Sequence, residues 1–109
     1  MACNDKVVLC FKRGDTFELS GILQDEGIPV NLTGYSIAAQ IRNGGWLVST
    51  LQCTITDAVL GQYNIFKAHA DTKDWPTRDL EMDIEFTTAD SKRISTETII
   101  IRVEIDQTL

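Results

Sequence analysis

The residues that could carry out catalysis are few and scattered. The sequence contains one histidine, His69, and three cysteines, Cys3, Cys10 and Cys53. No second histidine, Cys-x-x-Cys pair or Ser-x-Gly elbow accompanies them. One histidine and three unlinked cysteines do not supply the ligand spacings of a zinc site. We therefore expect no enzyme, no catalytic residue, no metal site and no cofactor, with His69 in a loop.

A second candidate for chemistry is the acidic series Glu81, Asp83 and Glu85. Side chains two residues apart on a strand lie ~7 Å apart, a spacing that suits a cation or a pair of acid/base carboxylates. The same alternation is typical of the water-facing side of an antiparallel sheet, which is the interpretation we adopt. The basic residues that could pair with this face from a partner strand are Lys92, Arg93 and Arg102.

Aromatic residues form the third candidate, because an exposed aromatic platform can stack on sugars. Tyr35 and Tyr63 lie at the starts of predicted strands, so we expect them in the core or at its corners. We expect Trp46 and Trp75 to cap the ends of the domain. A carbohydrate-binding module is kept as an alternative function.

The composition describes one ordinary globular domain. The chain has 109 residues, of which 43% are hydrophobic and 24% charged. This length supports a single core, so we expect one domain over residues 1–109, with residues 1–4 as a loose N-terminal tip. The odd cysteine count favours synthesis in a reducing cytoplasm, with Cys10 and Cys53 as small apolar fillers.

The charge and hydropathy exclude several classes of partner. The net charge is −6, and no basic run exceeds two residues, so we expect no nucleic-acid binding. The chain contains no apolar run long enough for a signal peptide or a membrane span, so we expect no membrane partner.

The fold that must position these side chains is organised around the C-terminal residues 79–106. Two segments alternate apolar and polar side chains, and a polar stretch at residues 87–92 separates them. This pattern predicts a hairpin with one apolar face, which requires a second sheet to cover it. The inward residues of the two strands are Leu80, Met82, Ile84, Phe86, Ile99, Ile101, Val103 and Ile105.

The rest of the chain supplies the remaining strands of an all-β sandwich of seven or eight antiparallel strands. Asn43-Gly44-Gly45 predicts a tight hairpin turn, and residues 25–27 predict another. Residues 68–75 lack a period of two and predict one helical turn or a loop. The further strands are predicted at residues 6–11, 16–24, 35–41, 46–56 and 62–67.

The order of turn and core residues resembles a family of small structural proteins of tailed bacteriophages and prophages. The element at residues 27–35, Gly-Ile-Pro-Val-Asn-Leu-Thr-Gly-Tyr, is also similar to the N-terminal immunoglobulin-like domain of phage baseplate upper proteins. The resemblance does not extend to the helical linker and receptor-facing part of those proteins, so we expect an adaptor or decoration role and not direct host binding. The other matching segments are residues 13–17, 40–42, 55–57, 61–63, 75–76, 83–84 and 95–98, with Thr72.

The resemblance implies an immunoglobulin-like sandwich and a non-enzymatic virion protein, synthesised in the bacterial host cytoplasm. Its expected role is an adaptor of the tail, baseplate or tail-fibre attachment, bound to copies of itself and to other virion proteins as a homo-oligomer. The alternatives are a capsid decoration (cement) protein and a carbohydrate-binding module that reads host glycans.

Protein contacts are expected at apolar residues that the core does not require. The segment at residues 6–11 is apolar on both faces, which suits a covered strand or pairing with a neighbouring subunit. Trp46 follows a turn, and Val48 and Ile100 fall on nominally outward faces. The predicted protein-interface residues are Val7, Val8, Leu9, Trp46, Val48 and Ile100.

Overall fold

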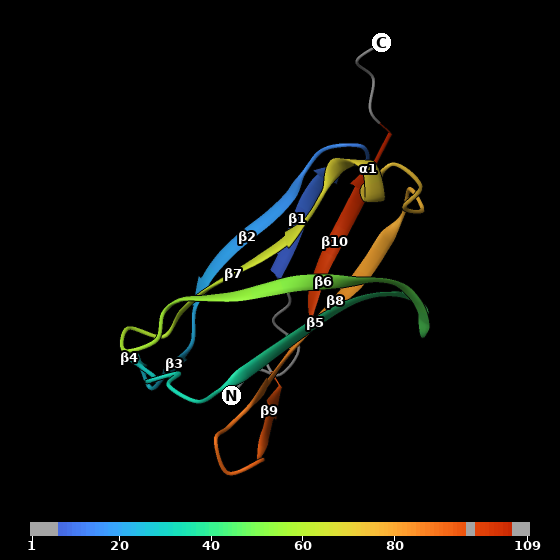
Figure 1. Cartoon of the computed structure of the whole chain (residues 1–109). Coiled ribbons are helices and arrows are strands. Elements are labelled where there is room, and N and C mark those ends of the chain that lie inside the picture. Colours follow the sequence, from blue (N-terminus) through green and yellow to red (C-terminus); the bar gives the residue numbers. More distant parts are fainter. Residues whose placement is uncertain (1–6, 96–97, 106–109) are drawn as a thin grey trace.

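A computed structural model describes residues 7–95 and 98–105 of the chain (Figure 1). The predicted tip at residues 1–4 lies outside the described residues. The elements are β1 (Val7–Lys12), β2 (Phe17–Ile22), β3 (Gln24–Asp25), β4 (Ile28–Pro29), β5 (Ser36–Asn43), β6 (Trp46–Asp57), β7 (Gln62–Lys67), α1 (His69–Thr72), β8 (Asp79–Thr87), β9 (Arg93–Ser95) and β10 (Ile99–Glu104).

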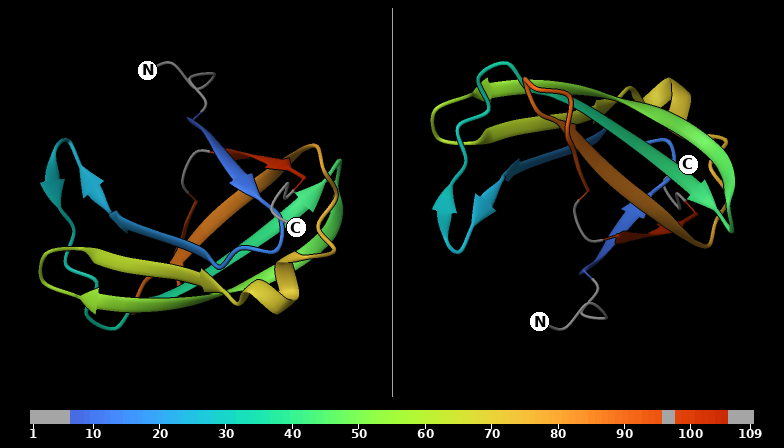
Figure 2. Two further views of the ribbon diagram at one scale, coloured as in Figure 1. Left: turned by 90° about the horizontal axis from the view of Figure 1, so that it is seen from above. Right: turned by 90° about the horizontal axis from the view of Figure 1, so that it is seen from below.

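Eight of the described strands form one sheet that folds back on itself into two layers (Figure 2), and β3 and β4 pair separately as a two-stranded sheet. The order of the eight-stranded sheet is β1-β10-β8-β5-β6-β7-β2, with β9 paired to β8. Strand β6 belongs to both layers, because residues 46–51 pair with β5 and residues 52–57 pair with β7. The predicted all-β sandwich is confirmed, and seven of the ten described strands are at least six residues long.

The predicted C-terminal hairpin exists as the antiparallel pair of β8 and β10, with Ile101 opposite Leu80. The short strand β9 lies between them in sequence and also pairs with β8. One inward position was wrong: Ile105 follows β10 and is 56% exposed. The buried hydrophobic residues between the layers are Phe17, Leu32, Ala39, Ile41, Leu51, Tyr63, Ile65, Trp75, Leu80, Met82, Ile84, Phe86, Ile101 and Val103.

Strand β1 departs from the predicted antiparallel arrangement, because it runs parallel to β10 with Val8 beside Ile100. Parallel neighbours require a long crossover connection, and here nearly the whole chain lies between the two strands. The first strand of the chain therefore ends one side of the sheet.

The hairpin predicted at residues 43–45 is confirmed, with the turn centred on Gly44 and Gly45. Both glycines have positive φ angles, and Asn43 pairs with Trp46 across the turn. Farther along, the register shifts so that Ile41 lies opposite Ser49 and Arg42 opposite Leu47. The extra residue is Val48, which forms a β-bulge. Because of this bulge, the alternation of core-facing and outward-facing side chains along β6 changes parity at Val48.

Helix α1 is the single helical turn that residues 68–75 predicted. It ends at Thr72, which is fully buried and ties the helix to the turn between β1 and β2. The Thr72 hydroxyl donates to the carbonyl of Asp15 at 2.7 Å and accepts the N–H of Gly14 at 2.9 Å. Within the described part of the chain, no helix is long and apolar enough to cross a membrane.

Substitution of Gly61 tests how closely the turn between β6 and β7 is packed. The φ of Gly61 is +68°, and an added Cβ would lie 2.7 Å from the carbonyl oxygen of Leu23 and 2.8 Å from that of Val30. We expect Gly61→Ala to lower the free energy of unfolding by about 3 kcal/mol, because backbone strain and a backbone clash combine. Urea unfolding measures the loss.

The matched control is Gly44→Ala. Gly44 has a φ of +57° but no heavy atom within 4 Å of an added Cβ, so only backbone strain of about 1 kcal/mol is expected. Equal losses in the two variants would show that the turn at Gly61 is not closely packed.

Candidate interaction surfaces

The N-terminal strand β1 forms a free edge of the described sheet. Its one neighbour there is β10, and Val7 and Val8 remain 54% and 45% exposed. The Arg13 N–H donates to the carbonyl of Glu104 at 3.0 Å, which places the odd-numbered residues of β1 in the ladder with β10. The N–H and C=O groups of Val8 and Cys10 consequently point toward the open side.

The structure brings together two of the predicted interface residues on the outer face of the sheet. Val8 and Ile100 are register partners, so their side chains lie on the same face about 5 Å apart. Leu9, also predicted, is half-buried and packs against the core from the opposite face of β1. The surface at β1 therefore combines unpaired backbone groups with an apolar strip.

The other two predicted interface residues lie elsewhere. Trp46 is 81% exposed beside the β5–β6 turn, so its predicted role as a cap of the domain was wrong. Val48 packs against the core because of the bulge, so its predicted outward face was also wrong. Its neighbour Leu47 is the exposed residue, at 53%. Contact with a partner at all six residues stays a prediction.

The acidic side chains of β8 form ion pairs and hydrogen bonds of the kind usual at a protein surface. Arg93 Nε lies 3.8 Å from Glu85 Oε1, and Thr98 donates to Asp83 at 2.8 Å. Asp83, Glu85 and Thr98 border a surface hollow of about 440 Å³. Among the residues that the structure describes, no group of three or more His, Cys, Asp or Glu could hold a metal ion.

The basic partners differ in part from the prediction. Arg93 pairs with Glu85, and Arg102 binds Asp79, on the same face of β8, through two hydrogen bonds of 2.9 Å and 3.2 Å. Lys92 lies 3.7 Å from Asp90 within its own turn. The hydrogen bond from Arg102 lowers the pKa of Asp79; desolvation opposes this effect in part, and the charge of Arg102 adds to it.

Histidine, cysteine and aromatic residues do not converge on one site. His69 is exposed on α1, and Cys10 is exposed on β1, so the prediction that Cys10 fills the core was wrong. Cys53 does pack against the core, and burial raises the pKa of its thiol. Trp75 and Tyr63 are 2% and 8% exposed, so they cannot form a sugar platform with Trp46.

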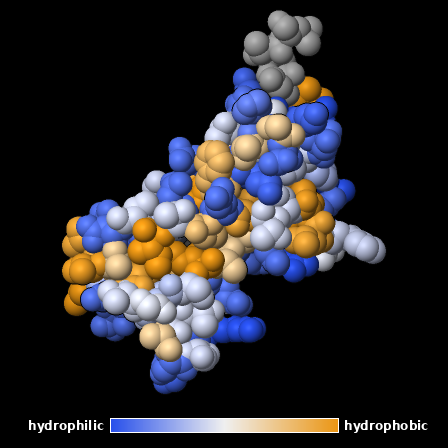
Figure 3. Space-filling model, in the orientation of Figure 1, coloured by the Kyte–Doolittle hydropathy of each residue, from blue (hydrophilic) through white to orange (hydrophobic). Residues whose placement is uncertain are grey.

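One surface was missed by the sequence analysis. Ile22, Ile28, Val59 and Leu60 are between 48% and 69% exposed and gather at the end of the molecule that carries β3 and β4. Figure 3 shows apolar surface concentrated at this end. A signal was present, because Val59 and Leu60 are aliphatic residues in the connection between the strands predicted at residues 46–56 and 62–67, where polar residues are usual.

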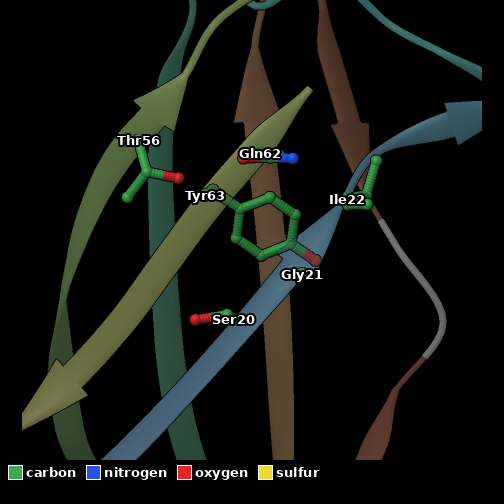
Figure 4. A pocket seen from close by; sticks show the side chains of 6 residues that line it. All are labelled: Ser20, Gly21, Ile22, Thr56, Gln62 and Tyr63. Atoms are coloured by element: carbon green, nitrogen blue, oxygen red, sulfur yellow. The ribbon is translucent and has the colours of Figure 1, made fainter. Parts of the chain in front are cut away.

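A hollow adjoins this surface beside Ile22. It has a volume of about 320 Å³ and lies between the ends of β2, β6 and β7. Figure 4 shows the Tyr63 ring lying across β2 at Gly21. A Cβ at Gly21 would lie 2.5 Å from the Tyr63 hydroxyl, so glycine is required for this packing. The lining residues are Ser20, Gly21, Ile22, Thr56, Gln62 and Tyr63.

The ion pair of Arg102 and Asp79 can be tested by titration. Arg102→Gln should raise the pKa of Asp79 toward the ordinary value of aspartate, because the hydrogen bond and the positive charge are removed. In the wild type, the pair stabilises the fold above the ordinary aspartate pKa, and this contribution is lost as the pH falls through the lowered pKa.

Carboxyl carbon chemical shifts followed by NMR give the pKa directly. Arg93→Gln is the control, since Arg93 pairs with Glu85 and not with Asp79. A pKa of Asp79 that is the same in the wild type and in Arg102→Gln would contradict the role of the pair.

Comparison with known proteins identifies the fold. No family model and no curated protein matches the chain. Among 52 chains of solved structures that match is one from the monoclinic crystal structure of the ZIG-8–RIG-5 IG1–IG1 heterodimer. The match has a TM-score of 0.52 at 10% identity and covers 95% of this chain and 87% of that one. The chain therefore has an immunoglobulin-like β-sandwich fold.

Proposed function

We propose that the chain is a non-enzymatic structural protein of a tailed-phage particle. It acts as an adaptor in the tail, baseplate or tail-fibre attachment, where it contacts copies of itself and other virion proteins. It is made in the host cytoplasm and works in the assembled particle. The resemblance of its turn and core residues to small phage structural proteins supports this assignment.

The observation that carries the proposal is the free edge of β1. Val8 and Cys10 direct backbone N–H and C=O groups away from β10, and an extended segment of another subunit can pair with them. The apolar strip of Val8 and Ile100 lies beside this edge and adds hydrophobic burial to the contact.

The structural neighbour supports the use of this scaffold for protein contacts. That neighbour is a chain from a heterodimer of two immunoglobulin domains. Immunoglobulin-like sandwiches serve many unrelated functions, so the edge strand of this chain supports the function more directly than the fold does.

Replacing an edge side chain tests the proposed self-association. Val8→Lys should give a monomer, because a lysine in the interface places a charge where apolar side chains and strands meet. Sedimentation velocity measures the mass. Ile94→Lys is the matched control, since Ile94 is 41% exposed on β9, outside the proposed surface. An unchanged oligomer in Val8→Lys, or no oligomer in the wild type, contradicts self-pairing at β1.

Proline substitutions test the backbone groups themselves. Val8→Pro removes an N–H that points to the open edge, so the monomer should stay folded while association is lost. Leu9→Pro removes an N–H that bonds to β10 and should lower the melting temperature strongly. If the two variants have the same melting temperature, the assignment of the ladder is wrong.

Location in the particle separates the tail adaptor from a capsid decoration protein. Gold-labelled antibody against the chain should mark the tail or its fibre attachment in electron micrographs of phage particles. Label over the head supports the decoration role and rejects the tail adaptor.

A further inference from the structure

Four exposed aliphatic side chains form the surface at the end of the molecule that carries β3 and β4. We call Ile22, Ile28, Val59 and Leu60 the apolar tip. Ile28 and Val59 are the most exposed of the four, at 69% and 66%. They project from the β3–β4 hairpin and from the turn between β6 and β7, at the end of the molecule remote from α1 (Figure 2).

Hydrogen bonds hold the segments of the apolar tip side by side. The Leu23 N–H donates to the carbonyl of Gly61 at 2.9 Å, and the Val30 N–H donates to the carbonyl of Leu23 at 2.9 Å. The Leu32 N–H donates to the carbonyl of Ala58 at 2.7 Å. The four aliphatic side chains are therefore presented on a fixed framework, so little conformational entropy is lost when a partner binds.

The charges around the apolar tip have one sign. Asp25 and Glu26 are exposed on the hairpin, and Asp57 accepts the N–H of Leu60 at 3.3 Å in the facing turn. None of the three forms a salt bridge with another described residue. The segments that form the apolar tip contain no lysine or arginine, since neither occurs at residues 14–41 or 43–66.

The combination of exposed aliphatic side chains and acidic side chains favours one class of partner. A second copy docking tip to tip would set the acidic residues of the two chains against each other, which costs binding energy. An anionic membrane surface would be repelled for the same reason. A different protein with an apolar surface bordered by lysine or arginine satisfies both the aliphatic side chains and the carboxylates.

We propose that the apolar tip binds a second kind of protein through a hydrophobic contact bordered by basic residues of that partner. The hollow at Gly21 and Tyr63 adjoins Ile22 and receives one side chain of the partner, since its volume of about 320 Å³ is at the small end for ligand clefts. The surface is separate from the edge of β1, so one subunit contacts its own copies and another protein at the same time.

Amphipathic peptides supply the test. A helical peptide of leucine and lysine stands for the proposed partner, and a peptide of the same pattern with leucine and glutamate is its charge-reversed control. The leucine–lysine peptide should bind the full chain by isothermal titration calorimetry and shift the amide resonances of residues 22–30 and 57–62. The double variant Ile28→Ser, Val59→Ser should bind it at least about tenfold more weakly.

The control variant is Trp46→Ser, Leu47→Ser, which removes exposed apolar side chains at the β5–β6 turn and should retain wild-type affinity. Equal weakening in both double variants, or equal binding of the leucine–glutamate peptide, overturns the proposal. Binding of the chain to phosphatidylglycerol vesicles that the apolar-tip variant loses identifies a membrane site instead.

The experiments distinguish failure of the proposed contact at the apolar tip from failure of the proposed self-association at β1. Val8→Lys should bind the leucine–lysine peptide as the wild type does, and the apolar-tip double variant should keep the wild-type sedimentation mass. An oligomer that dissociates in the apolar-tip variant shows that this surface joins copies of the chain and overturns the proposal.

Discussion

The structure depends on the continuity of β6 through both layers. Its first half pairs with β5 and its second half with β7, so the two layers are halves of one sheet. A sheet that folds back without closing must keep two ends, and here the ends are β1 and β2. The positions of both proposed surfaces follow from this, because β1 presents an open edge and β2 leads into the apolar tip.

The interior keeps the edge of β1 in place although that strand has one neighbour in the described sheet. The Phe11 ring packs 5.3 Å from Phe17 and 5.4 Å from Trp75, measured between ring centroids. The three rings join β1, β2 and the segment after α1, and the buried hydroxyl of Thr72 links the same parts through the turn at Gly14. Aromatic contacts and a satisfied buried polar group therefore fix the strand before any partner arrives.

Periodicity predicted the strands because one face of each is buried, and it failed where the pattern depends on distant contacts. The bulge at Val48 shifts the parity of β6, and no local residue signals it. The parallel pairing of β1 and the exposure of Cys10 depend on which strand ends the sheet, which is a property of topology. The apolar tip was missed because its residues come from separate turns that hydrogen bonds bring together. Arg102 does lie on the acidic face of β8, but the register sets it beside Asp79, two residues before Glu81.

The two surfaces use different physical means of selecting a partner. The edge of β1 offers backbone groups, which are the same in every protein, so its selectivity must come from Val8, Ile100 and the fit of the neighbouring subunit. The apolar tip offers side chains, and its acidic border discriminates against a second copy of this chain. A net charge of −6 also opposes indiscriminate pairing between free edges, because it keeps the chains apart until a complementary contact outweighs the repulsion. The proposed association through β1 should therefore become stronger as salt screens that charge.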